Sequence, residues 1–133
     1  MSDPKSYYAR WKHNRGLARV CRTRFIDGQE WAIVLSFYAA VHIIEGYMRT
    51  KDERFWSEDH VRRVKSLRQS PEARQVAALY RDLTDLSESV RYQPGFQPKD
   101  QDFDHARDWL HRIESMLKGP FSRAVGEDPN DVQ

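Results

Sequence analysis

The sequence predicts an all-α, single-domain bundle of about five helices. Apolar residues recur every three or four positions along most of the chain, which is the period of an amphipathic helix. No segment shows the alternation of a strand, and the polar breaks between apolar runs are short, which favours an up-and-down topology. A length of 133 residues is that of one domain. We expect the bundle to span 1–119 and an acidic, frayed tail to span 120–133.

The first helix, expected over 5–25, is strongly basic. Residues 1–26 carry seven Lys or Arg and one acid, whereas the rest of the chain carries 15 basic and 19 acidic residues. Such a helix attracts polyanions, so Arg15, Arg19 and Arg22 are candidate ligand-binding residues. Nucleic acid, an acidic protein partner, the acidic tail of the same chain and a solvated face without a partner all remain open as explanations.

The second helix is expected over 30–50, opened by a capping box at 27–30. It is apolar almost all round, so we expect it to be the buried, central helix, with Trp31, Tyr38 and His42 sharing one face. His42 and Glu45 are polar exceptions within this run, and a buried imidazole is costly unless it is hydrogen-bonded. His42 is therefore either a structural histidine or part of a site.

The remaining helices are placed by their start and stop signals. Ser57 is the expected N-cap of a short helix, and Pro71 suits the first turn of the fourth. The fourth helix should stop at 92–95, and the last helix should end at Gly119–Pro120.

Most familiar chemistries have no motif here, because the chain lacks a Gly-rich phosphate loop, a G-x-S-x-G and an H-E-x-x-H. With Cys21 as its one cysteine it can form neither an internal disulfide nor a thiolate metal site. A metal site from His42 and His60 would need carboxylates that the sequence does not bring to them, so we expect no metal and no cofactor. Polar residues interrupt the longest apolar run and no signal sequence opens the chain, so we expect a cytoplasmic protein with no membrane partner.

One pair of residues has the side chains that metal-independent RNA cleavage needs. Arg54 and His60 are separated by five residues, and an imidazole can move protons while a guanidinium binds the phosphate. A capping Ser57 surrounded by solvated charges explains the same segment equally well. Arg91 and Tyr92 end the fourth helix, where the arginine either satisfies the last carbonyls or points to the same end of the bundle as His60.

Three segments together resemble the HEPN family (higher eukaryotes and prokaryotes nucleotide-binding domain). They are "LSFYAAVHIIEGYM", "SEDHVRRVKSL" and "LYRDLTDLSESVRY", in the family's order and spacing. The resemblance implies a small cytoplasmic helical bundle, often a homodimer, found in bacterial defence systems or in toxin–antitoxin pairs with a nucleotidyltransferase. Ribonucleases of the family carry Arg, four to six residues, then His. Here Arg54 and His60 fit that spacing, no histidine follows Arg91, and Arg107 and His111 are one residue too close.

Two functional hypotheses follow. The first is a HEPN-like protein that binds RNA or nucleotide phosphate and, if it is an enzyme, is a metal-independent endoribonuclease acting as a toxin or accessory defence component. In that case we expect His60 as acid or base, Arg54 or Arg63 with Arg91 as phosphate ligands, His42 with Tyr38 as an orienting pair, and Tyr92 at the substrate. The alternative is a non-catalytic dimerisation or interaction module that docks an acidic partner or nucleic acid on its basic first helix.

Overall fold

The structure, a computed structural model, describes residues 3–24, 28–52, 55 and 59–132. These residues form five α-helices and one short 3-10 helix, without a strand, which confirms the predicted all-α class. The elements are α1 (Pro4–Arg24), α2 (Glu30–Lys51), α3 (His60–Gln69), α4 (Arg74–Tyr92), α5 (Asp100–Val125) and η1 (Pro129–Asp131).

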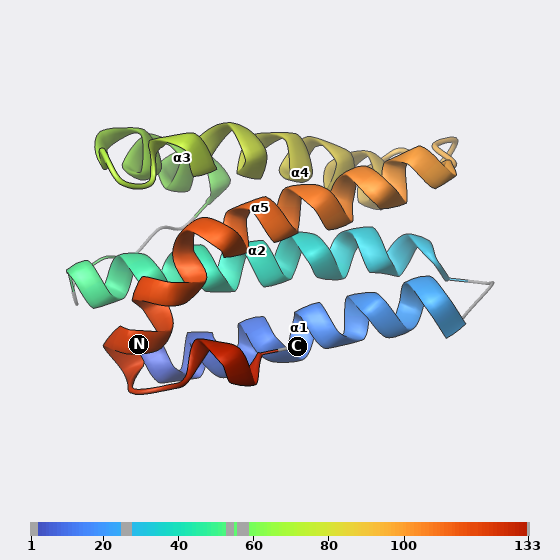
Figure 1. Cartoon of the computed structure of the whole chain (residues 1–133). Helices are drawn as coiled ribbons and strands as arrows, with labels where there is room; N and C mark the ends of the chain where they lie inside the picture. Colours follow the sequence, from blue (N-terminus) through green and yellow to red (C-terminus); the bar gives the residue numbers. More distant parts are fainter. Residues whose placement is uncertain (1–2, 25–27, 53–54, 56–58, 133) are drawn as a thin grey trace.

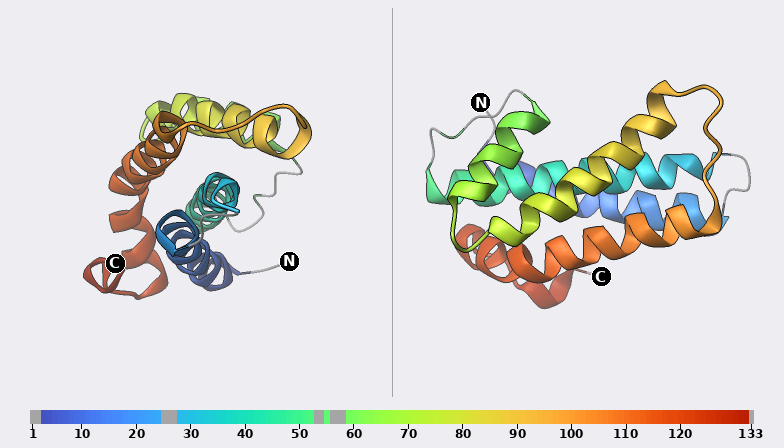
Figure 2. Two further views of the ribbon diagram at one scale, coloured as in Figure 1. Left: turned by 90° about the vertical axis from the view of Figure 1, so that its right-hand side faces the viewer. Right: turned by 90° about the horizontal axis from the view of Figure 1, so that it is seen from above.

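Helices α1 and α2 lie antiparallel along their whole length, and α5 runs back beneath α4 at an angle (Figure 1). Seen end-on, α3–α4 and α5 form two adjoining walls, with α1 and α2 side by side in the angle between them (Figure 2). This arrangement gives α2 neighbours on several sides but leaves part of its surface without a covering helix.

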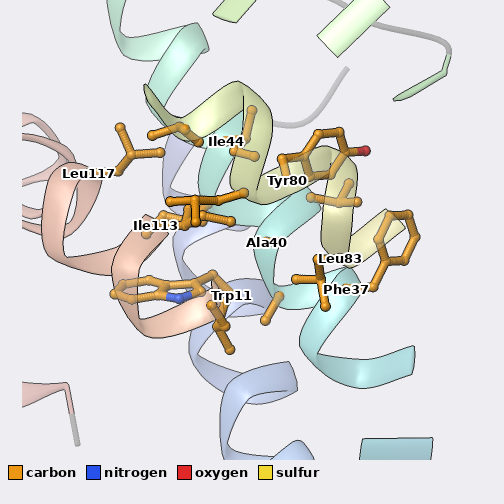
Figure 3. Packing of buried hydrophobic residues seen from close by; sticks show 14 of the residues in the cluster. Trp11, Phe37, Ala40, Ile44, Tyr80, Leu83, Ile113 and Leu117 are labelled. Carbon is orange, nitrogen blue, oxygen red and sulfur yellow. The ribbon is translucent and has the colours of Figure 1, made fainter. Parts of the chain in front are cut away.

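The core lies where α2 meets the other long helices. Trp11 from α1, Ile44 from α2, Tyr80 from α4 and Ile113 from α5 are all fully buried there and pack into one cluster (Figure 3). By length and composition α2 could also cross a membrane, but 72% of its most apolar window is buried inside the bundle. A core helix of a soluble protein passes the same test, so this finding assigns no membrane role.

Several predicted helix starts differ from the structure. Asp27, the capping residue of the predicted box at 27–30, lies outside the described residues, and Gln29 occupies the N-cap position of α2 without a side-chain capping bond. Ser57 lies outside the described residues, and Asp59 caps α3 by accepting a hydrogen bond of 2.9 Å from the Arg62 backbone N–H. Pro71 belongs to a turn that precedes α4 rather than to its first helical position.

The prediction that the last helix ends at Gly119–Pro120 was wrong, because α5 continues to Val125 with Pro120 inside it. A proline within a helix removes one hydrogen bond and crowds the preceding turn. Here the continued helix buries Phe121 and Val125 in the core, which offsets that cost. The helix ends instead at Gly126, whose φ of 78° permits the backbone bonds Gly126 N–H to Arg123 O and Glu127 N–H to Ser122 O of a Schellman motif.

The acidic tail also packs on the bundle rather than fraying. Val132 is buried against the core, and its carbonyl accepts a hydrogen bond of 3.3 Å from Lys118 Nζ. The apolar Val132 was the signal in the sequence that this segment returns to the core.

Gly46 marks a close approach of three helices, and this predicts a clear response to substitution. A Cβ at Gly46 would lie 2.9 Å from both Tyr7 Cβ of α1 and Phe121 Cε1 of α5. We expect Gly46→Ala to lower the free energy of unfolding by about 1–3 kcal/mol through overpacking, despite the higher helix propensity of alanine. Urea denaturation followed by circular dichroism measures this.

Gly16 provides the matched control, because it also lies inside a helix but has open space around its Cα. Gly16→Ala is expected to raise the free energy of unfolding by up to about 1 kcal/mol. If both substitutions stabilise the protein, the close packing at Gly46 is contradicted.

Candidate functional site

Six of the predicted site residues lie on two separate surfaces. The first, called the aromatic face, consists of Trp31 and Tyr38 on α2 with Arg91 and Tyr92 at the end of α4. The second, called the basic pocket, lies between α1, α2 and α5 and contains the predicted Arg15, Arg19 and Arg22. Residues of α2 contribute to both surfaces from different sides of that helix.

Arg91 is the centre of the aromatic face. Its guanidinium carbon lies 4.9 Å from the centroids of the Phe37 and Tyr92 rings and 5.9 Å from that of Tyr38. The Nε–H donates to the Ser87 carbonyl at 3.4 Å, as expected for a basic residue in the last turn of a helix. No acidic side chain in the described part of the chain pairs with this guanidinium. The rings therefore hold a positive charge that is not neutralised by an acid.

Three large aromatic side chains on this face are exposed. Trp31, Tyr38 and Tyr92 keep 58%, 39% and 70% of their surface accessible. The sequence predicted a buried α2, and most of the helix is buried, but no described helix covers the side of its N-terminal half that carries Trp31 and Tyr38. Their spacing of seven residues places them on one side of the helix, about 10 Å apart along its axis.

His42 lies further along α2 and is largely buried. Burial and, to a smaller extent, the positive charges of Arg10 and Arg63 together lower the pKa of its imidazole to about 4, so the ring is neutral near pH 7. Its Nδ1 is buried with no hydrogen-bond partner among the described residues. The aromatic neighbour of the imidazole is Tyr7, at 6.1 Å between ring centroids, whereas Tyr38 contacts Phe37 and Arg91. The structure therefore does not bring Tyr38 and His42 together as an orienting pair.

Glu45, the second polar residue in this apolar helix, belongs to a buried hydrogen-bonded network. Its Oε1 accepts a hydrogen bond of 2.9 Å from Arg63 Nε, and Arg63 Nη1 donates to the Tyr80 hydroxyl at 3.1 Å. Burial raises the pKa of Glu45, and the nearby Arg63 charge opposes that rise. Arg63 thus binds the core side of α2, which leaves its Nε and Nη1 engaged rather than open to a phosphate.

His60 is the first residue of α3, the short helix that also carries Arg63. Its Nε2 is 3.7 Å from Glu88 Oε1 on α4, and both side chains are about half exposed. Arg54, its predicted partner, lies outside the described residues. Of the predicted catalytic set, the structure brings Arg63 to Glu45 and Arg91 to the aromatic rings, and it joins neither to His60 through a contact within the described chain.

The basic pocket does bring predicted residues together. Arg15, Arg19 and Arg22 line it from α1, and α5 adds two residues that were not predicted for this site, Arg107 and His111. Their spacing of four residues places them on one face of α5, and this was the available signal.

No group of three or more His, Cys, Asp or Glu side chains within the described ranges is arranged to hold a metal ion. Comparison with known proteins adds no assignment: no protein-family model matches the chain, and neither a curated protein nor a solved structure matches it significantly.

Proposed function

We propose that this protein binds single-stranded RNA on the aromatic face. The observation that supports this is the Arg91 guanidinium held against three rings while Trp31, Tyr38 and Tyr92 remain exposed. Proteins that bind single strands combine exposed aromatic rings, on which bases stack, with cations that contact the backbone.

The proposed activity is binding rather than cleavage. Cleavage without a metal requires an imidazole and a guanidinium that reach one phosphate. His42 is partly buried and neutral near pH 7, and two donor nitrogens of Arg63 are occupied by Glu45 and Tyr80. Arg91 has a free charge, but no imidazole contacts it in the described part of the chain.

The other expectations from the HEPN resemblance belong to the same proposal. They are an up-and-down, HEPN-like bundle, a homodimer, a cytoplasmic location, and a cognate nucleotidyltransferase or antitoxin as partner. The exposed aromatic face supports contact with another molecule, because a group of large apolar side chains exposed on one face often marks an interaction site.

Removing the aromatic face is expected to weaken RNA binding. Tyr92→Ala should reduce the affinity for a fluorescein-labelled single-stranded oligoadenylate by about 5- to 100-fold, the effect of losing one stacked base. Arg91→Ala should weaken binding and lower the slope of log K against log salt by about 0.7, corresponding to one lost phosphate contact. Fluorescence anisotropy over a range of salt concentrations measures both.

Arg74→Ala is the matched control, since Arg74 is exposed at the opposite end of α4. Equal losses for Arg91→Ala and Arg74→Ala would show a diffuse charge effect and contradict the proposed surface.

The same samples, incubated in EDTA and separated on a denaturing gel, show whether the bound RNA is cut. Cleavage that persists in Arg91→Ala would place a nuclease centre elsewhere.

A further inference from the structure

The basic pocket is a second, separate candidate site. Its volume is about 260 Å³. Its floor is apolar and its rim is cationic, and no acidic side chain is among the residues that line it: Arg15, Ala18, Arg19, Arg22, Thr23, Ala32, Ile33, Ser36, Phe103, Ala106, Arg107, Leu110 and His111. We propose that this pocket binds a phosphate monoester whose organic group is a compact apolar ring system.

Arg15 supplies the strongest evidence for an anion. Its Nε and Nη2 face the buried Glu114 carboxylate, at 2.6 Å and 3.4 Å. The planar guanidinium then directs Nη1 away from that carboxylate, and Nη1 is buried without a hydrogen-bond partner in the described chain. Buried donors are almost always satisfied, so this unpaired one beside a pocket needs an explanation. Nη1 has almost no accessible surface, so a phosphate oxygen in the pocket would become its acceptor once the guanidinium turns toward the pocket.

The rim offers further charge that is not firmly neutralised. No acidic residue among those described pairs with Arg19. Arg22 Nη2 is 3.9 Å from a carboxylate oxygen of Asp100 and equally far from one of Asp104, longer than a direct hydrogen bond. Arg107 pairs with exposed acids on its own helix. A doubly charged phosphate with three terminal oxygens matches several guanidinium groups better than a single carboxylate does.

The apolar floor of the basic pocket indicates the kind of organic group that the ligand would carry. Three alanines, Ala18, Ala32 and Ala106, face the pocket from three different helices, and their short side chains leave the space between those helices open. A volume of about 260 Å³ equals that of about nine water molecules, enough for one or two fused rings but small for a larger ligand. Phe103 provides an aromatic wall, with the Arg22 guanidinium carbon 4.6 Å from its ring centroid.

This inference goes beyond RNA binding on the aromatic face and does not depend on it. Ala32 and Ser36 reach the pocket from one side of α2, whereas Trp31 and Tyr38 project from another. The two sites can therefore be tested with different probes and different variants.

Isothermal titration calorimetry of the whole chain with 1-naphthyl phosphate, inorganic phosphate and 1-naphthol tests the proposal. We expect 1-naphthyl phosphate to bind at least about tenfold more tightly than either of its parts, because it uses both the rim and the floor. Arg19→Ala should weaken its binding by about 10- to 100-fold through the loss of a charged hydrogen bond. Ala106→Leu, which fills the floor, should abolish binding of the naphthyl group.

Arg112→Ala is the matched control, because Arg112 is exposed on α5 and does not line the pocket. It should leave 1-naphthyl phosphate binding unchanged. Circular dichroism checks that each variant is folded. If Ala106→Leu does not fold, the effect of Arg19→Ala on 1-naphthyl phosphate binding tests the proposal. The proposal is overturned if 1-naphthyl phosphate binds no better than inorganic phosphate, if neither binds, or if Arg19→Ala and Arg112→Ala have equal effects.

Discussion

Replacing Arg63 by alanine is expected to lower the free energy of unfolding by about 3 kcal/mol. The Glu45 side chain is only 4% exposed and that of Arg63 13%, so the variant leaves a buried carboxylate without its principal hydrogen-bonded cation. Breaking a buried ion pair from one side costs about 3–5 kcal/mol because the remaining charge is desolvated and uncompensated. Arg49 also lowers the pKa of Glu45 and so compensates part of the loss, which is why we expect the lower end of that range.

A double-variant cycle with Glu45→Leu and Arg63→Met separates the interaction energy of the ion pair from the cost of leaving one charge buried without its partner. Removing both charges together should recover most of the stability lost in Arg63→Ala, since apolar residues of similar size replace a buried pair at little cost. The exposed pair of Lys51 and Glu72, 2.9 Å apart, is the control. Lys51→Ala should have a much smaller effect in the same urea titrations. Equal effects of Lys51→Ala and Arg63→Ala would contradict the buried network.

This stability effect bears on any functional test of the predicted catalytic residues. Arg63 was predicted from the HEPN resemblance as a phosphate ligand, and the structure makes it the cation of a buried network with Glu45 and Tyr80. Loss of RNA binding in Arg63→Ala would therefore report unfolding as well as a lost contact. Arg91 and Tyr92 lie at the exposed end of α4 and give a cleaner test.

The sequence was sufficient for the helices and most of the core, because helical periodicity is a local property. Leu83 and Ile113, which belong to the apolar recurrence of every three or four positions, are both fully buried. The sequence-based prediction failed at Pro120, where a local stop signal is outweighed by burial of Phe121, a contact with residues far away in the chain. Burial by distant elements cannot be read from a local pattern.

The site was harder to predict for the same reason. Because α2 is apolar all round, its sequence does not show which of its sides lacks a neighbouring helix. The positions of α4 and α5 determine which side stays uncovered. The partner of Glu45 is 18 residues away and the partner of Arg15 is 99 residues away, so neither pairing follows from spacing. The basic charge of α1 was visible in the sequence, but the alanine floor that turns it into a pocket depends on three helices meeting.

We expect His42 to lower the free energy of unfolding as the pH falls below about 6.5. The pKa of this imidazole is about 4 in the folded protein and 6.5 for the unperturbed group. Between these values the unfolded chain binds a proton that the folded chain does not, so stability falls as the pH is lowered from about 6.5 to about 4. The full shift corresponds to about 3 kcal/mol as an upper limit, and solvent screening at this partly accessible ring reduces the expected loss to about 1–2 kcal/mol.

The groups around His42 determine how this contribution is isolated. Arg10 faces it from α1 and Arg63 from α3, and both disfavour the imidazolium, while Tyr7 packs beside the ring. Glu45, one turn further along α2, has a raised pKa, so its protonation stabilises the folded state as the pH falls and partly masks the effect in the wild type. The difference between the wild type and His42→Gln removes this common term.

We therefore expect thermal melts from about pH 7 to about pH 4 to show a smaller loss of stability in His42→Gln than in the wild type, with the difference growing as the pH falls. The exposed His13 of α1, replaced in His13→Gln, controls for removing an imidazole from the surface. A direct readout is the ring-proton chemical shift of His42 in NMR spectra, which should titrate with a midpoint of about 4. A midpoint near 6.5, together with parallel melting curves for the two proteins, would show that the imidazole is hydrated and that α2 is more open at this position than the structure indicates.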